Sequence, residues 1–442
     1  MAILIIIAFV LGYALIAFEH PIRIDKAAPA LFTGVICWVI LVFGIEQMPV
    51  METLTGEHAD KTAFLKHALF EHLGSISEIL FFLLGAMTIV ELVDAHDGFR
   101  VITDRIKTTN KVKLLWILAW VCFFMSATLD NMTTTILMCA LLRKIMKDQE
   151  VMWLFGGFVI ISANAGGAWS PIGDVTTIML WIGGQVSAQN IILKTILPSM
   201  VSLLIPLIVA SFVLRKENKP LEKLEDESSA SGHITTAFER NLIFILGVAS
   251  LLFVPVFKAL THLPPYMGIL LAVGSMWFVT ELIHRYKDDD KRTELSVAST
   301  LQKIDTPSIL FFLGILLAVG SLETSGYLGQ LAGVLDQHLG NIFAINTLIG
   351  FLSAIVDNVP MVAACMGMYD LVTYPQDHNF WELLAYCAGT GGSILIIGSA
   401  AGVAAMGILK VDFIWYLKRI SLYAIIGYIS GVGVYYFQSM LL

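Results

Sequence analysis

The chain has 442 residues, of which 57% are hydrophobic and only 14% charged, and its formal net charge is −8. An average soluble domain carries about 25% charged residues, so this composition excludes a soluble globular protein and indicates one embedded in a lipid bilayer. The charges form no basic patch suited to nucleic acid, and we expect no such partner. The five cysteines form no CxxC pair and lie in or beside apolar runs, so we expect packing residues and no cofactor.

Apolar runs recur along the whole chain and predict membrane helices, because a helix needs about 20 apolar residues to cross a bilayer. The first run, 2–18, has no basic segment before it and no A-x-A cleavage site, so we interpret it as a retained helix. The other runs of the first half lie at 28–45, 77–93, 114–129, 151–169 and 196–214. Those of the second half lie at 241–257, 266–283, 306–322, 342–356, 381–409 and 413–437.

The lysines and arginines predict the orientation, since cytoplasmic loops carry most of these residues. With both termini outside, the external segments hold only Lys61, Lys66, Lys194 and Lys258. This bias requires two segments, 114–146 and 342–372, to enter and leave the membrane on one side as re-entrant hairpins. The first has basic residues at both ends and so enters from the cytoplasm; the second lies within 322–380, which has no Lys or Arg, and enters from outside. Ten spans and two hairpins result.

The two halves of the chain resemble each other. EILFFLLGAMTIVEL (78–92) is similar to SILFFLGILLAVGSL (308–322), and SATLDNMTTTILM (126–138) to SAIVDNVPMVAAC (353–365). The odd number of spans in each half inverts the second copy, as in many secondary transporters. We therefore expect an all-α polytopic membrane protein of two inverted-topology repeats, each with five spans, one of them broken, and one re-entrant hairpin. The predicted segments are the first repeat at 1–214, with its broken span at 151–184, a cytoplasmic linker at 215–240, and the second repeat at 241–442, with its broken span at 381–409.

Both hairpins carry an Asp-Asn pair at the tip, Asp130-Asn131 in the first and Asp357-Asn358 in the second. A charge at the bilayer centre costs about 2.5–3.5 kcal/mol on insertion scales, so acids at corresponding points of both halves indicate function. Carboxylate, amide and carbonyl oxygens are the ligands that hard cations prefer. The alternative is that each Asp caps the following helix, and capping is compatible with ion binding.

The first broken span offers a second set of oxygen ligands. Gly166-Gly167 and the segment Ser170–Gly173 cannot continue a regular helix, so backbone carbonyls are exposed there. Asp174 then begins a half-helix, either as its cap or as an ion ligand or proton carrier. Further oxygens come from Asn164, Ser170, Thr176 and Thr177. The corresponding stretch of the second half, 391–399, has no carboxylate, which makes the expected site asymmetric.

The segments LDNMTTTILM, SPIGDVTTIM and VDNVPM resemble those of the NhaD type of sodium–proton antiporter, and the repeat plan is similar to that of a wider ion-transporter superfamily. The resemblance covers essentially the whole chain. It implies Na⁺ or Li⁺ export in exchange for H⁺ at alkaline pH, in a bacterial inner membrane, by a homodimer with a scaffold and a moving transport domain. The residues to which it carries a cation- and proton-binding role are Asp130, Asn131, Asn164, Asp174, Thr176, Thr177, Asp357 and Asn358.

From these observations we expect an antiporter that exchanges cytoplasmic Na⁺ or Li⁺ for external H⁺ by competition for buried aspartates, with elevator-like alternating access. Its partners would be the bilayer, monovalent cations and protons. The first alternative is a carboxylate or oxyanion carrier of the same fold; dicarboxylate carriers have Ser-Asn-Thr at the hairpin tips, where Asp-Asn stands here. An ion channel is the second alternative. An enzyme is not expected, because HExxH and GxSxG motifs are absent.

Two features at the predicted cytoplasmic face have both a structural and a functional interpretation. His96, between Asp94 and Asp97, is an interfacial residue or a pH sensor. The segment 97–113 predicts an amphipathic helix on the membrane surface.

Overall fold

The computed structural model describes residues 2–17, 19–49, 61–103, 108, 110–217 and 235–441, and within these ranges every regular element is a helix. The helices are α1 (Ala2–Ala17), α2 (Glu19–Ile22), α3 (Ala27–Gly44), η1 (Ile45–Gln47), α4 (Lys61–Ala95), α5 (Arg100–Thr103), α6 (Lys111–Leu129), α7 (Asn131–Ile145), α8 (Gln149–Gly167), α9 (Val175–Ile182), α10 (Ala188–Glu217), α11 (Ala237–Thr261), α12 (Pro265–His284), α13 (Asp289–Glu294), α14 (Val297–Lys303), α15 (Thr306–Thr324), α16 (Tyr327–Leu339), α17 (Ile342–Ser353), α18 (Asn358–Met368), α19 (Asn379–Gly391), α20 (Ala400–Leu409), α21 (Phe413–Arg419) and α22 (Ser421–Leu441).

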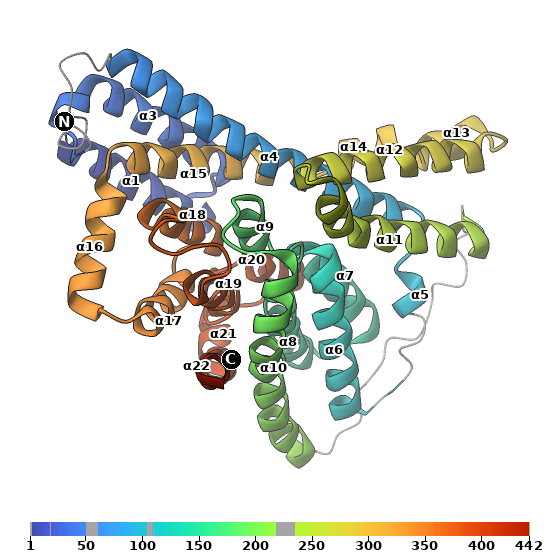
Figure 1. Cartoon of the computed structure of the whole chain (residues 1–442). Coiled ribbons are helices and arrows are strands. Elements are labelled where there is room, and N and C mark those ends of the chain that lie inside the picture. Colours follow the sequence, from blue (N-terminus) through green and yellow to red (C-terminus); the bar gives the residue numbers. More distant parts are fainter. Residues whose placement is uncertain are drawn as a thin grey trace.

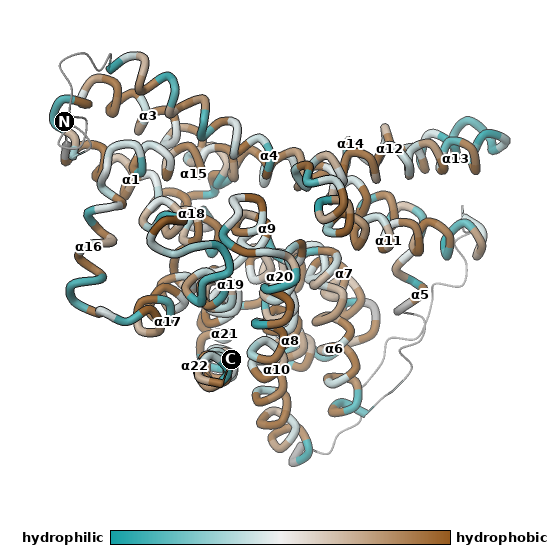
Figure 2. Tube along the Cα trace, viewed as in Figure 1, coloured by the Kyte–Doolittle hydropathy of each residue, from teal (hydrophilic) through white to brown (hydrophobic). Residues whose placement is uncertain are grey.

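The length and composition of these helices confirm a polytopic membrane protein. Among the described residues, nine helices are long and apolar enough to cross a bilayer, or ten if α20 and α21, bent by 117°, count as one span. Apolar residues dominate the long helices, and hydrophilic residues gather at segments such as α13 (Figure 2). Large apolar side chains also point outward; Phe43, for example, is 76% exposed. Such a surface is stable against lipid tails and not against water.

One set of helices, which we call the framework group, consists of α1, α3, α4, α11, α12 and α15. Within it α3 packs on α15 and α12 packs on α4, while α1 lies against α3 and α11 against α12. Figure 1 shows α3, α15 and α4 together along the top of the view, with α12 and α11 at its right. The α3–α15 crossing depends on two glycines: a Cβ on Gly34 would lie 2.5 Å from the Gly314 carbonyl oxygen, and one on Gly314 would lie 2.4 Å from the α3 backbone. Small residues thus allow close backbone contact.

A second set of helices, which we call the site group, consists of α6–α10 and α17–α22 (Figure 1). Its contacts come in matching pairs from the two halves of the chain: α6 packs on α8 as α17 packs on α19, and α7 meets α20 as α18 meets α9. The pairs α6–α8 and α17–α19 touch backbone to backbone. A Cβ on Gly166 would lie 2.2 Å from Phe123 O, and one on Gly391 would lie 2.1 Å from Gly350 O. Each hairpin arm is therefore joined closely to the broken helix beside it.

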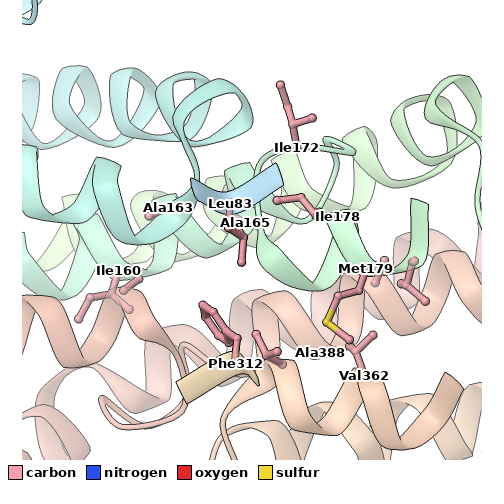
Figure 3. Packing of buried hydrophobic residues seen from close by; sticks show 14 of the residues in the cluster. Leu83, Ile160, Ala163, Ala165, Ile172, Ile178, Met179, Phe312, Val362 and Ala388 are labelled. Carbon is pink, nitrogen blue, oxygen red and sulfur yellow. The ribbon is translucent and has the colours of Figure 1, made fainter. Parts of the chain in front are cut away.

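Apolar side chains fill much of the surface between the two groups. Phe82 of α4 meets the ring of Trp181 on α9 edge to face, with ring centroids 6.4 Å apart. α18 packs on α15 in the same region. Figure 3 shows buried side chains here from both groups, among them Leu83, Phe312, Met179, Val362 and Ala388. The polar contacts across this interface include Lys26 with Asp357, Tyr13 with Asp357, and Lys258 with Trp181.

Several elements differ from the sequence-based expectation. The run 77–93 is part of a 35-residue helix, α4, which begins at Lys61 because the polar residues before the run continue the helix. The expected final span 413–437 is divided at Ile420 into α21 and α22. α16 was not expected. Of the amphipathic segment 97–113, α5 covers only Arg100–Thr103, and part of that segment, like most of the linker 215–240, lies outside the described residues.

Candidate functional site

A single buried carboxylate, that of Asp174, lies where both hairpins meet the first broken helix. Asp174 is the N-cap of α9 and is 1% exposed. Its Oδ1 accepts a hydrogen bond from Thr176 N at 3.0 Å, so the expected capping role is present. The chain reaches this position through a non-helical turn anchored by Ser170, whose hydroxyl donates to Ala127 O at 2.5 Å. The glycine and proline residues of the turn account for the break between α8 and α9.

The asparagines at the two hairpin tips both donate to the Asp174 carboxylate. Asn131 begins α7, and its Nδ2 lies 2.7 Å from Asp174 Oδ2. Asn358 begins α18, and its Nδ2 lies 3.2 Å from the same oxygen and 3.3 Å from Oδ1. Both asparagines are buried, at 2% and 1% exposure. Residues separated by more than 180 positions thus converge on one acid.

Asn164 connects this centre to the second broken helix. Its Oδ1 accepts from Asn131 Nδ2 at 3.0 Å, and its Nδ2 lies 2.9 Å from the hydroxyl oxygens of both Ser393 and Ser399. Ser399 caps α20 as Asp174 caps α9. The sequence interpretation did not assign these two serines to the site. The signal for them was the match between the two broken segments, which places Ser399 opposite Asp174.

Asp130, at the tip of the first hairpin, uses its carboxylate as a helix cap. Oδ1 accepts from Thr133 N and Oδ2 from the Thr133 hydroxyl, both at 2.8 Å. Its backbone has φ of +71°, in a region that costs of order 1–3 kcal/mol for a residue with a side chain. The capping alternative therefore applies to Asp130. Its strained backbone turns the chain sharply, so that Asn131 points toward Asp174.

Asp357, at the tip of the second hairpin, is held differently. Its side chain makes no cap hydrogen bond to α18, and its N–H donates to the Tyr13 hydroxyl of α1 at 2.8 Å. Its buried Oδ1 has no hydrogen-bond partner among the residues that the structure describes. Its Oδ2 lies 3.9 Å from Lys26 Nζ. Lys26 was expected in a cytoplasmic loop, and nothing in the sequence indicated that it reaches a hairpin tip.

The two remaining candidates, Thr176 and Thr177, lie buried in the first turn of α9 beside Asp174. The Thr177 hydroxyl donates to Asp174 O at 2.9 Å. The site therefore contains carboxylate, amide and hydroxyl oxygens that are buried. The charges of Asp130 and Asp357 also act on Asp174. Among the described residues, no group of three or more His, Cys, Asp or Glu could hold a metal ion.

Comparison with known proteins gives consistent matches over most of the chain. A family model described as "Citrate transporter" matches residues 13–389. "Sodium/proton antiporter 1" of Arabidopsis thaliana is 49% identical over 430 residues, which is 97% of this chain and 71% of the relative. "Na(+)/H(+) antiporter NhaD" of Alkalimonas amylolytica is 32% identical over 97% of this chain and 88% of the relative. The protein of the same name from Vibrio cholerae is 30% identical over 97% of this chain and 90% of its own length.

Proposed function

The chain belongs to the NhaD-type sodium/proton antiporters within the citrate-transporter family, so it is a membrane transporter and not an enzyme, and we propose that it exchanges cytoplasmic Na⁺ or Li⁺ for external H⁺. The observation that supports this most is the convergence of Asn131, Asn358 and Asn164 around the buried carboxylate of Asp174. A small hard cation is bound well by carboxylate, hydroxyl and amide oxygens, and a proton binds the carboxylate itself.

Competition between the two ions provides the coupling. Burial and neighbouring acids both disfavour a bare carboxylate, so Asp174 needs either a cation or a proton to remain in this site. In the present arrangement both of its oxygens accept N–H hydrogen bonds, which is the pattern of an ionised carboxylate. A proton on either oxygen would face a donor. A proton on Asp174 and a cation beside it both need an amide oxygen in place of an N–H, so binding either ion requires at least one asparagine amide to rotate.

The two helix groups suggest how the site changes sides. The hairpins and broken helices are joined backbone to backbone, whereas the contact between the groups at Phe82 and Trp181 is made by apolar rings. We propose that the site group moves as a body across the framework group, as an elevator. The matching contact pairs α6–α8 with α17–α19, and α3–α15 with α12–α4, support the proposed inverted repeats. The predicted boundaries of those repeats and the re-entrant hairpins belong to the same proposal.

Membrane orientation and assembly are part of the same proposal. We propose a multi-pass protein with external termini that forms a homodimer. For a bacterial source the membrane would be the inner one; the relatives include plant as well as bacterial proteins. The carboxylate or oxyanion carrier remains the second candidate, because the matching family model is described as a citrate transporter. Asp174 opposes it, since a bound carboxylate would meet a carboxylate at the centre of the site.

The direct test is Na⁺-dependent proton flux in everted vesicles from cells that lack other sodium/proton antiporters, with citrate uptake measured in parallel. Asp174→Asn is expected to abolish exchange, because the replacement cannot take up a proton and turns an N–H group toward the hairpin amides. Glu150→Gln is the matched control: Glu150 is an exposed acid at the start of α8, the helix that carries Asn164. Full exchange by Asp174→Asn, or citrate uptake without cation exchange, would overturn the proposal.

A further inference from the structure

Two lysines of the framework group reach the site group from corresponding places. Lys26 lies directly before α3, where the chain turns from the α1 region, and Lys258 lies in the last turn of α11, directly before the turn into α12. α1 and α3 pack on each other as α11 and α12 do. Lys258 follows Lys26 in the chain at nearly the offset that relates the two Asp-Asn tips. We therefore treat the two lysines as counterparts in the proposed repeats.

Lys26 is placed as the counter-ion of a hairpin acid. Its Nζ lies 3.9 Å from Asp357 Oδ2 and 4.5 Å from the centroid of the Phe311 ring on α15. The side chains of Lys26 and Asp357 are only 19% and 14% exposed. The Tyr13 hydroxyl accepts the N–H of Asp357, so the framework group holds this tip by two contacts. Weak hydration strengthens such a pair relative to one on an open surface.

Lys258 has a different partner in the same structure. Its Nζ donates to Trp181 O at 2.9 Å and lies 4.7 Å from the centroid of the Trp181 ring. Trp181 is in the last turn of α9, where the helix dipole favours a cation. Glu78 also acts on Lys258 electrostatically. Meanwhile Asp130, the counterpart of Asp357, has its carboxylate bonded to Thr133 of its own helix.

We interpret the different partners of the two lysines through the proposed inverted repeats. In a transporter of this kind, exchanging the conformations of the two halves produces the state open to the opposite side. In that state Lys258 would occupy the place relative to Asp130 that Lys26 now has relative to Asp357. We propose that Lys26 and Lys258 are alternating counter-ions of the transport cycle: Lys26 neutralises Asp357 in the conformation described here, and Lys258 neutralises Asp130 in the opposite one. This inference rests on the proposed antiport function and on the proposed repeats.

The predicted topology agrees with this assignment. Lys26 is expected on the cytoplasmic side and Lys258 on the external side, whereas the hairpin that carries Asp357 enters from outside. Its tip meets Lys26 only if the site group is displaced toward the cytoplasm. The described conformation is then the one that opens to the cytoplasm. There a fixed ammonium competes with Na⁺ for a carboxylate at the edge of the site, and an entering Na⁺ must displace it.

Cross-linking tests the alternation without requiring transport. Cysteines introduced as Lys26→Cys with Asp357→Cys, and as Lys258→Cys with Asp130→Cys, are treated in membranes with a short bifunctional thiol reagent. The five native cysteines are buried, so variants that carry only one of the two introduced cysteines serve as negative controls. Both pairs are expected to cross-link, and the pair Lys258→Cys with Asp357→Cys is expected not to. Cross-linking of Lys26→Cys with Asp357→Cys, without any cross-linking of Lys258→Cys with Asp130→Cys, would overturn the proposed alternation.

Sodium affinity provides the second measurement. In everted vesicles Lys26→Met is expected to lower the half-saturating Na⁺ concentration by about twofold to tenfold, the range of a partly screened ion pair. Lys66→Met, an exposed lysine of α4, is the control and is expected to leave it unchanged. An unchanged value for Lys26→Met in a chain that exchanges Na⁺ for H⁺ would refute the role of Lys26. Absence of exchange in the unmodified chain would instead refute the proposed function, and the cross-linking result would still decide the geometry.

Discussion

Asn164→Ala provides a sharp test of the site, because Asn164 is the side chain that connects the broken helices of the two halves. The substitution removes three side-chain hydrogen bonds, one accepted from Asn131 and two donated to Ser393 and Ser399. Buried hydrogen bonds in membrane proteins contribute on average about 0.6 kcal/mol each, so the free energy of unfolding should fall by about 2 kcal/mol. The loss would be larger at Ser393, which is buried, than at Ser399, whose hydroxyl still accepts a hydrogen bond from Gly402 N.

The assay is thermal unfolding in detergent, with and without saturating Na⁺. A ligand at 100 times its dissociation constant stabilises the folded state by about 2.7 kcal/mol, so the unmodified chain should show a clear Na⁺-dependent rise in Tm. Asn164→Ala should show a lower Tm and almost none of this rise. Asn346→Ala is the matched control, because Asn346 is equally buried and, among the residues that the structure describes, its side chain donates to Ile342 O of its own helix. Equal behaviour of the two variants would refute the reasoning.

Three further predictions concern other parts of the fold. Gly314→Ala should lower Tm, because the added Cβ would lie 2.4 Å from backbone atoms of α3 and overpacking costs about 1–3 kcal/mol. Gly329→Ala is the control and should not lower Tm, because the space around Gly329 is open. His96 is buried, and this burial lowers the pKa of its imidazole, so folding favours the neutral form. The free energy of unfolding should therefore decline as the pH falls below about 6.5, and His96→Gln should weaken this decline in melting curves taken across pH. Tyr13→Phe removes the hydroxyl that accepts the N–H of Asp357 and should increase amide hydrogen exchange at that hairpin tip, while unchanged exchange there would contradict the contact.

The sequence was informative about which segments are helical and which polar residues lie among them. Apolar runs and Gly-Pro breaks indicated helices close to α3, α8, α9, α15 and α19, because hydropathy and backbone chemistry are local properties. The Asp-Asn pairs and Asp174 stood out for the same reason, since polar residues in apolar segments are costly. Their convergence was a hypothesis, and the hydrogen bonds of Asn131 and Asn358 to Asp174 now give it a geometry.

Features that depend on contacts distant in sequence could not be predicted. Ser393 and Ser399 are ordinary helix-breaking and capping residues until Asn164 is placed beside them. Lys26 is one of many basic residues, and the packing of α15 on both α3 and α18 brings it to Asp357. The break at Ile420 lies in a run with no glycine or proline at that point, so composition gave no signal for it. α16 is short and mixed in polarity, which hydropathy does not separate from a loop.

The backbone contacts at Gly166 and Gly391 have a consequence for how transport properties can evolve. Because they fasten each hairpin arm to its broken helix, a bound ion would keep the same ligands from one side of the membrane to the other. Under the proposed elevator movement, discrimination between ions depends on the ligands around Asp174, and the turnover rate depends on the apolar contact between Phe82 and Trp181. Substitutions at this contact are expected to adjust the turnover rate to a different lipid or temperature without changing ion selectivity.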